Sequence, residues 1–286
     1  NRGGRLAADE VNGTPYGRPE DLEIVDKMLF LAVTSEQMVL SIELVSESSA
    51  MVRVFASRST LDSANGVPVG EALASPDNLA SDADGTIYIV EDQNPGDIWV
   101  TVDADHDGVA ESMARWASLG VEGSEPTGLI PTSNPRKFIV SIQHPSSGND
   151  ALWEITVDPS VTTMLTASAT VTDEANAPFL LPDGFTQTLI VDRNTANEDS
   201  DFVATFGNWD MIALDPSEQF IYIPHEVGTG AGLTRYDRTT GDFVTAMTGD
   251  NSGNFVTKPS WRPCNGGDFG ALDPAEWTPA STIMAG

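Results

Sequence analysis

The chain has 286 residues, of which 43 are acidic and 14 basic, and its formal net charge is −29. Such acidity disfavours nucleic acids and anionic membranes as partners, because both bind basic surfaces. The longest apolar run, 28–33, is far too short to span a bilayer, so we expect no direct membrane insertion. The acidity fits solubility in a salty or calcium-rich compartment, a store of cation ligands, or both. The length allows one all-β domain.

The location of the protein in the cell has to be inferred indirectly. The chain opens on Asn1 and shows no signal peptide, so we interpret it as a mature or partial chain. A single cysteine, Cys264, rules out an internal disulfide, although large secreted domains do not need one. We expect an extracytoplasmic location: secreted, periplasmic or in an organelle lumen.

One pattern recurs along the chain. It consists of a polar leader, a short strand, a turn and an apolar strand, and it covers 18–33, 75–92, 125–144 and 208–226. In the second copy, strands at 78–81 and 86–90 flank a turn in which Gly85 can adopt φ > 0. Repeats roughly 50 residues apart indicate a β-propeller or a similar radial array. The predicted fold class is therefore an all-β propeller, with six blades as one option and an incomplete or circularly permuted ring as another.

The remaining segments divide the chain into three parts. Residues 1–158 hold propeller blades, including a further hairpin at 39–45 and 51–55. Residues 159–182 are small, polar and without periodicity, which favours a linker or an extended arm and makes this the expected contact region for protein partners. Residues 183–286 hold further blades.

A propeller would bring the repeat leaders together, because the innermost strands all begin at one mouth of the central channel. The residues expected to converge there are Glu20, Asp77, Glu125 and Asp210, with Asp92, His144 and Glu226 just behind them. Arg18 precedes the first of these acids. Its guanidinium either forms a local ion pair or binds a phosphate group through two parallel N–H groups. His144 and His225 each follow a strand and are either ligands or structural residues.

A second acidic pattern starts at Asp103. Carboxylates at Asp103, Asp105 and Asp107, with Gly108 next and Glu111 ninth, match the first half of a calcium loop. The twelfth position is Ala114, so the bidentate glutamate of an EF-hand is missing. The alternative is an Asp-rich turn in water. We favour calcium.

The carboxyl-terminal stretch 261–270 is rich in turns and contains Cys264 among glycines. A cysteine near a channel mouth is either a metal thiolate or a buried structural thiol.

Several motifs together resemble the PhoX family of calcium-dependent alkaline phosphatases, which have a propeller fold. The resemblance covers most of the chain. It rests on RLAADEVNGTP at 5–15 with RPE at 18–20, SPDNL at 75–79 with Asp92, EPTG at 125–128 through QHP at 143–145, FLLPDGF at 179–185, PHE at 224–226 through GLTR at 232–235, and RPCNGG at 262–267.

The resemblance implies a site with two irons and calcium ions that hydrolyses small phosphate esters. If the family's residue roles apply to the matching positions here, Cys264 ligates iron, while Glu20, Asp77 and Asp92 ligate metals. Arg18 would hold the phosphate. The expected function is therefore a metal-dependent phosphomonoesterase.

Two departures qualify that expectation. The blocks stand in permuted order, joined at 159–182, which a closed propeller tolerates because its ends meet. A glutamate pair that follows the cysteine block in the family would begin about where this chain ends, at Gly286. We therefore expect weak or no hydrolysis from these 286 residues alone. The alternative is a non-catalytic, calcium-stabilised propeller that serves as a subunit of a larger assembly.

Overall fold

The computed structural model describes residues 8–199, 207–227, 232–249, 255–256, 272, 274–278 and 280–285. Within this part of the chain the regular secondary structure is almost entirely antiparallel β-sheet. In the same ranges, no helix is long and apolar enough to cross a membrane.

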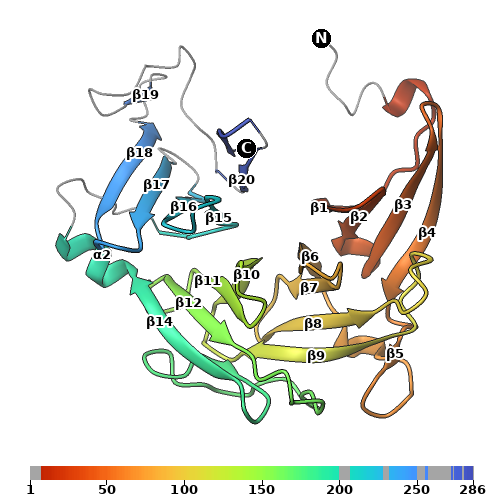
Figure 1. The fold of residues 1–286 in the computed structure, drawn as a ribbon, viewed down its shortest axis with the longest axis horizontal. Coiled ribbons are helices and arrows are strands. Elements are labelled where there is room, and N and C mark those ends of the chain that lie inside the picture. Colours follow the sequence, from red (N-terminus) through yellow and green to blue (C-terminus); the bar gives the residue numbers. More distant parts are fainter. Residues whose placement is uncertain are drawn as a thin grey trace.

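Four antiparallel sheets form four blades that follow one another around an arc (Figure 1). Blade 1 consists of β1 (Pro19–Val25), β2 (Met28–Val33), β3 (Met38–Ser46) and β4 (Ser49–Ser57). Blade 2 consists of β6 (Pro76–Ser81), β7 (Ile87–Glu91), β8 (Gly96–Val102) and β9 (Ser112–Leu119), extended by β5 (Leu61–Asp62) and β13 (Phe179–Leu180).

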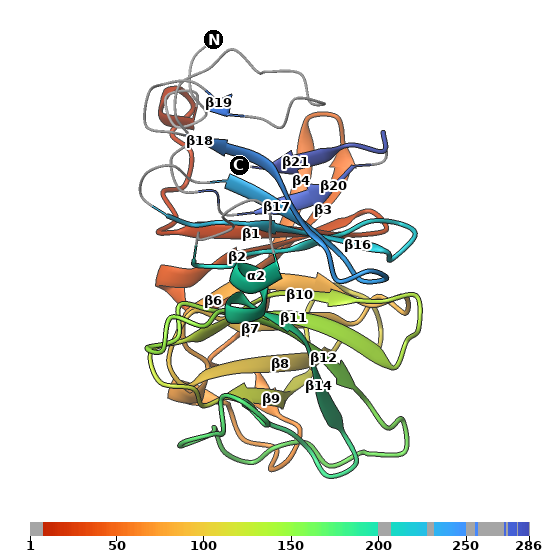
Figure 2. The same cartoon turned by 90° about the vertical axis from the view of Figure 1, so that its left-hand side faces the viewer.

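Blade 3 consists of β10 (Glu125–Pro131), β11 (Lys137–Gln143), β12 (Ala151–Thr156) and β14 (Thr186–Asp192). Blade 4 consists of β15 (Ala213–Leu214), β16 (Phe220–Pro224), β17 (Gly232–Asp237), β18 (Phe243–Gly249) and β19 (Phe255–Val256). A separate hairpin is formed by β20 (Ala275–Trp277) and β21 (Ile283–Ala285). Residues 8–10 are helical, and the other helical pieces are η1 (Thr34–Glu36), η2 (Gly70–Ala72) and α2 (Arg193–Asp199). Helix α2 follows β14 at the side of the arc (Figure 2).

The expected propeller is confirmed, and the four repeats are the inner hairpins of the four blades. Each pairs an innermost strand with the apolar strand after it: β1 with β2, β6 with β7, β10 with β11 and β15 with β16. β7 is buried at all five positions because its blade is covered on both faces by neighbouring blades. Strands covered on both faces read as continuous β-branched and aromatic runs, as 87–90 does.

The core lies between successive blades. Phe30 and Phe55 of blade 1 pack with Trp99 of blade 2, and Tyr88 of blade 2 packs with Phe138 of blade 3. Each large apolar side chain buried in this way contributes roughly 1.5–3 kcal/mol. Interdigitation of the blades therefore fixes their order and keeps the innermost strands adjacent.

The segment 159–182 lies inside blade 3, between β12 and β14, and packs along the outer edge of blade 2. Phe179 pairs with Leu119 of β9, and the Ser168 hydroxyl donates to Asp97 Oδ2 at 2.7 Å. Asp97 is buried and also holds the guanidinium of Arg115 in an ion pair. The proposed division at 159–182 thus falls within one sheet, since β12 and β14 pair directly.

The innermost strands line a channel of about 630 Å³. Residues of β1, β6, β10, β15 and β20 all contribute to its wall. The opposite face of blade 1, which is turned away from blade 2, carries exposed aliphatic side chains, among them Leu22, Ile24 and Val52.

Candidate functional site

The chain enters its innermost strands through a sharp local bend. Arg18 and Ser75 directly precede β1 and β6, and both have φ of 49°. Just inside each strand the pairing register shifts. In β6, Pro76 pairs with Glu91 and Asn78 with Val90, so Asp77 is an extra residue. Such β-bulges re-aim side chains, and here the bulge releases the carboxylate from the regular alternation of the strand.

A cavity of about 300 Å³ lies at the channel mouth that these leaders surround. All four blades and the residue before β20 contribute side chains to it. Its lining comprises Arg18, Glu20, Asp21, Asp77, Asp92, Glu125, Gln143, Asp210, Met211, Glu226 and Pro274. Within the described ranges, seven of these lining residues are carboxylates and one is basic, so this part of the cavity wall is strongly electronegative.

Arg18 bridges the acids of blades 1 and 2. Its Nε donates to Glu20 Oε1 at 2.7 Å and its Nη2 donates to Asp92 Oδ2 at 3.0 Å, while Asp77 Oδ1 lies 3.6 Å from Nη2. These contacts raise the pKa of the guanidinium, with the Asp92 hydrogen bond as the largest cause. The half-exposed side chain therefore stays charged at the edge of the cavity.

Asp77 is the acid whose ionisation is most strongly opposed. Burial, followed by the charges of Asp92, Glu20 and Glu125, raises its pKa to about 8. Among the described residues, Arg18 is the cation that counteracts this repulsion, and it offsets the repulsion only partly. At neutral pH Asp77 must therefore hold a proton unless another positive charge enters the cavity.

Glu125 and Asp92 form a pair of facing carboxyl groups. Burial and the neighbouring Asp92 raise the pKa of Glu125 to about 7, whereas the hydrogen bond with Glu125 lowers the pKa of Asp92. Glu125 Oε2 is buried and, among the described residues, no fixed donor reaches it. Two such groups share either a proton or a cation.

His144 stands behind Glu125. Its Nε2 lies 2.8 Å from Glu125 Oε1 and its Nδ1 lies 3.0 Å from the carbonyl of Gly123. The Glu125 hydrogen bond raises the pKa of His144 to about 9, so the ring carries a proton on both nitrogens at neutral pH. In this arrangement His144 donates to Glu125 and to the carbonyl of Gly123 and thereby orients the Glu125 carboxylate.

Two buried polar residues that we did not predict, Asn78 and Thr127, form hydrogen bonds with the cavity acids. Asn78 Oδ1 accepts from Thr127 Oγ1 at 2.7 Å, and Asn78 Nδ2 donates to Asp77 Oδ2 at 2.6 Å. Thr127 Oγ1 also lies 2.8 Å from Asp210 Oδ1. This network joins blades 2, 3 and 4. The one sequence signal for it is a polar residue inside an otherwise apolar strand.

The structure thus brings together all six acids expected at the mouth: Glu20, Asp77, Asp92, Glu125, Asp210 and Glu226. Cys264 lies outside the described residues. His225 is buried 2.8 Å from Thr234 Oγ1 and is not part of the cavity lining.

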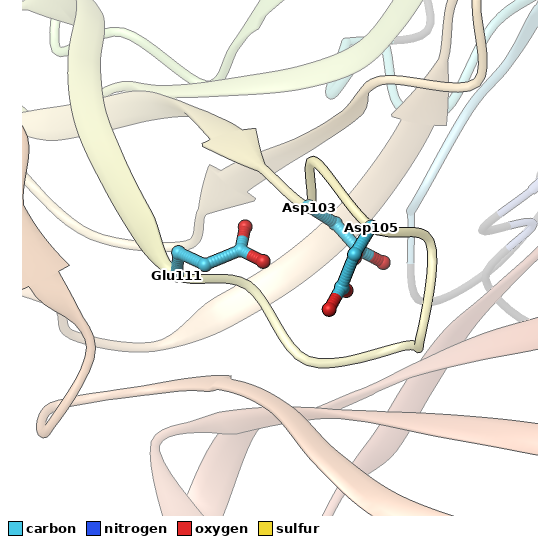
Figure 3. A group of neighbouring side chains, drawn as sticks. All are labelled: Asp103, Asp105 and Glu111. Atoms are coloured by element: carbon cyan, nitrogen blue, oxygen red, sulfur yellow. The ribbon is translucent and has the colours of Figure 1, made fainter.

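A second acidic group lies in the loop between β8 and β9, at the opposite end of the sheets. Carboxylate oxygens of Asp103, Asp105 and Glu111 come within 4.8 Å of one another (Figure 3). Asp107 is not in this group; its Oδ1 accepts from the backbone of Val109 at 2.8 Å. Oxygen donors at this spacing suit calcium, with Glu111 in the place we had assigned to Asp107.

No family model and no curated protein matches this sequence. Among solved structures, a glucose dehydrogenase aligns with 94% of this chain and 79% of its own, at 11% identity and a TM-score of 0.51. A chain of a nidogen/laminin complex aligns with 87% of this chain and 79% of its own length, at 11% identity and a TM-score of 0.50. The fold is a β-propeller.

Other propellers align less well. The PQQ-bound aldose sugar dehydrogenase from Streptomyces coelicolor gives a TM-score of 0.46 at 9% identity, covering 92% of this chain and 86% of its own. A candidate 6-phosphogluconolactonase from Bacteroides uniformis gives 0.45 at 9% identity over 80% of this chain, which spans about half (53%) of that protein. These proteins have diverse functions, so the comparisons define the architecture and no activity.

Proposed function

We propose that this chain is a metal-dependent phosphomonoesterase with a PhoX-like site at the channel mouth. The observation that carries the proposal is the position of Arg18 beside a cluster of mostly half-buried carboxylates contributed by all four blades. A solvated acidic face would spread its charges apart, whereas this arrangement concentrates them in one cavity.

The carboxylates fit a cation. Asp77 and Glu125 have raised pKa values because they are partly buried among like charges, and no fixed donor within the described part of the chain reaches Glu125 Oε2. A calcium ion prefers oxygen ligands and would replace the proton that these acids otherwise require. The residues proposed to hold metal are Glu20, Asp77 and Asp92. Iron would depend on Cys264, which lies outside the described residues.

Arg18 is proposed to bind the phosphate. Its guanidinium is held by Glu20 and Asp92, and a bound metal ion would compete for those carboxylates. The Arg18 guanidinium would then be able to point its N–H groups toward an anion entering from solvent. A metal at the site would supply Lewis acidity toward the phosphoryl group. The cavity of about 300 Å³ admits a phosphoryl group and excludes a folded nucleic acid.

Two readouts test this proposal: turnover of p-nitrophenyl phosphate at alkaline pH, and binding of inorganic phosphate by calorimetry, both with calcium and iron supplied. We expect phosphate binding with weak turnover. Arg18→Ala should abolish both, Arg18→Lys should retain part of the binding, and Arg58→Ala should change neither, because Arg58 pairs with the exposed Glu71. Binding and turnover that are indifferent to Arg18→Ala would refute the assignment.

A second function is favoured by the loop at Asp103. That loop is fixed to blade 1, since Ser41 Oγ donates to the carbonyl of Gly108 at 2.6 Å and Ala110 N donates to the carbonyl of Phe55 at 2.8 Å. Calcium there would tie two blades together in a non-catalytic, extracytoplasmic propeller that binds protein partners through 159–182. Stabilisation by calcium without any phosphate binding would favour this alternative.

A further inference from the structure

A larger cavity, of about 800 Å³, lies between blades 1 and 2. It is at the far end of the sheets from Arg18, because its walls are the turns at 26–27 and 84–86 and the start of the loop that follows β8. β1 and β6 run from the acidic mouth toward these turns. The cavity is therefore separate from the channel-mouth site.

The floor of this cavity is apolar. Phe30 and Phe55 line it with their rings 4.7 Å apart at 72°, and Met28 and Ile87 contribute beside them. These side chains belong to the core between the two blades. Because Phe30, Phe55 and Ile87 are themselves almost fully buried, the accessible apolar surface belongs to the partly buried Val25 and Met28 and to Val102. An aromatic or aliphatic group entering the cavity would exchange water for this surface, which favours binding in proportion to the apolar area covered.

The rim is acidic. Asp26 and Asp84 are exposed on the two turns, and Asp103 stands at the start of the loop. Glu43 also lines the cavity but is paired with Arg53 at 3.1 Å. Two further rim residues are basic or titratable: Lys27 and the exposed His106. If calcium neutralises Asp103, two acidic side chains, Asp26 and Asp84, still face one lysine, Lys27, at the rim.

The walls are held in place before any ligand arrives. The loop at 103–111 is tied to β3 and β4 through the hydrogen bonds of Gly108 and Ala110. A Cβ on Gly108 would come within 2.7 Å of the Met28 sulfur, so the loop packs tightly on the cavity floor. A preformed cavity of this size avoids much of the ordering cost of binding.

From the apolar floor and the acidic rim together, we propose that this cavity binds a small amphipathic organic cation. Its occupant has an aromatic or aliphatic body that lies against Val25, Met28 and Val102, and an amine that faces Asp26 and Asp84. Anions of the same shape are disfavoured by the rim and by the net charge of −29. This inference is independent of the phosphatase proposal.

Two probes with the same apolar body test it: 4-phenylbutylamine and 4-phenylbutyrate, titrated calorimetrically into the calcium-loaded protein in 0.15 M salt. We expect the amine to bind at least about tenfold more tightly than the acid, since like charges at the rim repel the latter. The double variant Asp26→Asn, Asp84→Asn should weaken amine binding about five- to tenfold. Asn suits position 26, where φ is 55°.

Controls distinguish the cavity from the general acidity of the protein. The double variant Glu71→Gln, Asp183→Asn removes the same charge from exposed positions elsewhere and should leave amine binding unchanged. Val102→Trp places a ring at the cavity wall from a half-exposed strand position and should abolish binding. Equal binding of the two probes, no binding of the amine at millimolar concentration, or equal losses in both double variants would overturn the proposal.

Discussion

Replacing Asp77 by Asn removes one charge from the channel mouth while preserving the shape of the side chain. The amide can still accept from Asn78, whose Nδ2 lies 2.6 Å from Asp77 Oδ2. In the native protein, burial and the acids around Asp77 raise its pKa from 3.8 to about 8. The folded state therefore binds a proton that the unfolded state releases between these two pH values.

The sign and size of the effect follow from proton linkage. A carboxyl group whose pKa is raised on folding stabilises the protein at low pH, and this contribution is lost as pH rises from about 4 to about 8. Each pH unit in that window is worth about 1.4 kcal/mol. Between pH 5 and pH 9, the wild-type protein should lose about 4 kcal/mol of stability because of Asp77 alone, and Asp77→Asn should not.

Urea unfolding in EDTA at several pH values measures this difference. Glu91, whose pKa burial also raises to about 8, adds a similar slope to both proteins, so the comparison isolates Asp77. Adding millimolar calcium should flatten the wild-type profile more than that of the variant, because a bound cation replaces the proton. Identical pH profiles for the two proteins in EDTA would refute the claim that Asp77 is buried among uncompensated charges.

Three further changes have defined outcomes. Asp105→Asn should remove most of the calcium-dependent rise in Tm, whereas Asp107→Asn should leave it intact; the reverse order would contradict the geometry of the loop. Arg115→Met should cost about 3–5 kcal/mol in urea unfolding, because it strands a buried carboxylate, and a loss below about 1 kcal/mol would show that the ion pair is dispensable. Gly128→Ala should destabilise far more than Gly148→Ala, since both have positive φ but only the first would place a Cβ 2.5 Å from a neighbouring backbone nitrogen; equal thermal shifts would indicate that strain outweighs the clash.

Local sequence was sufficient to place the inner hairpins. The alternation of turn residues and β-branched runs in 75–92 specifies two antiparallel strands, and a hairpin necessarily returns its ends to the same edge of the sheet. Asp77 and Asp92 were therefore predictable neighbours. The repetition of that unit also predicted the propeller and the gathering of leaders at one mouth.

Long-range packing decided what each acid does. Glu125 faces Asp92 and His144 because blades 2 and 3 interdigitate, and no spacing within either repeat encodes that distance. The network of Asn78 and Thr127 was missed for the same reason. Its members come from different blades, and each looks like an ordinary polar residue in its own strand.

The sequence by itself determined the strands, their inner pairing and the acidic character of the mouth, because hydrogen-bonded hairpins and side-chain alternation act over only a few residues. Tertiary structure alone decided that Glu111 rather than Asp107 joins the loop carboxylates, and that an apolar cavity opens beside them. Both depend on how one blade packs against the next. Such contacts join residues that are tens of positions apart in the chain, such as Ser41 and Gly108.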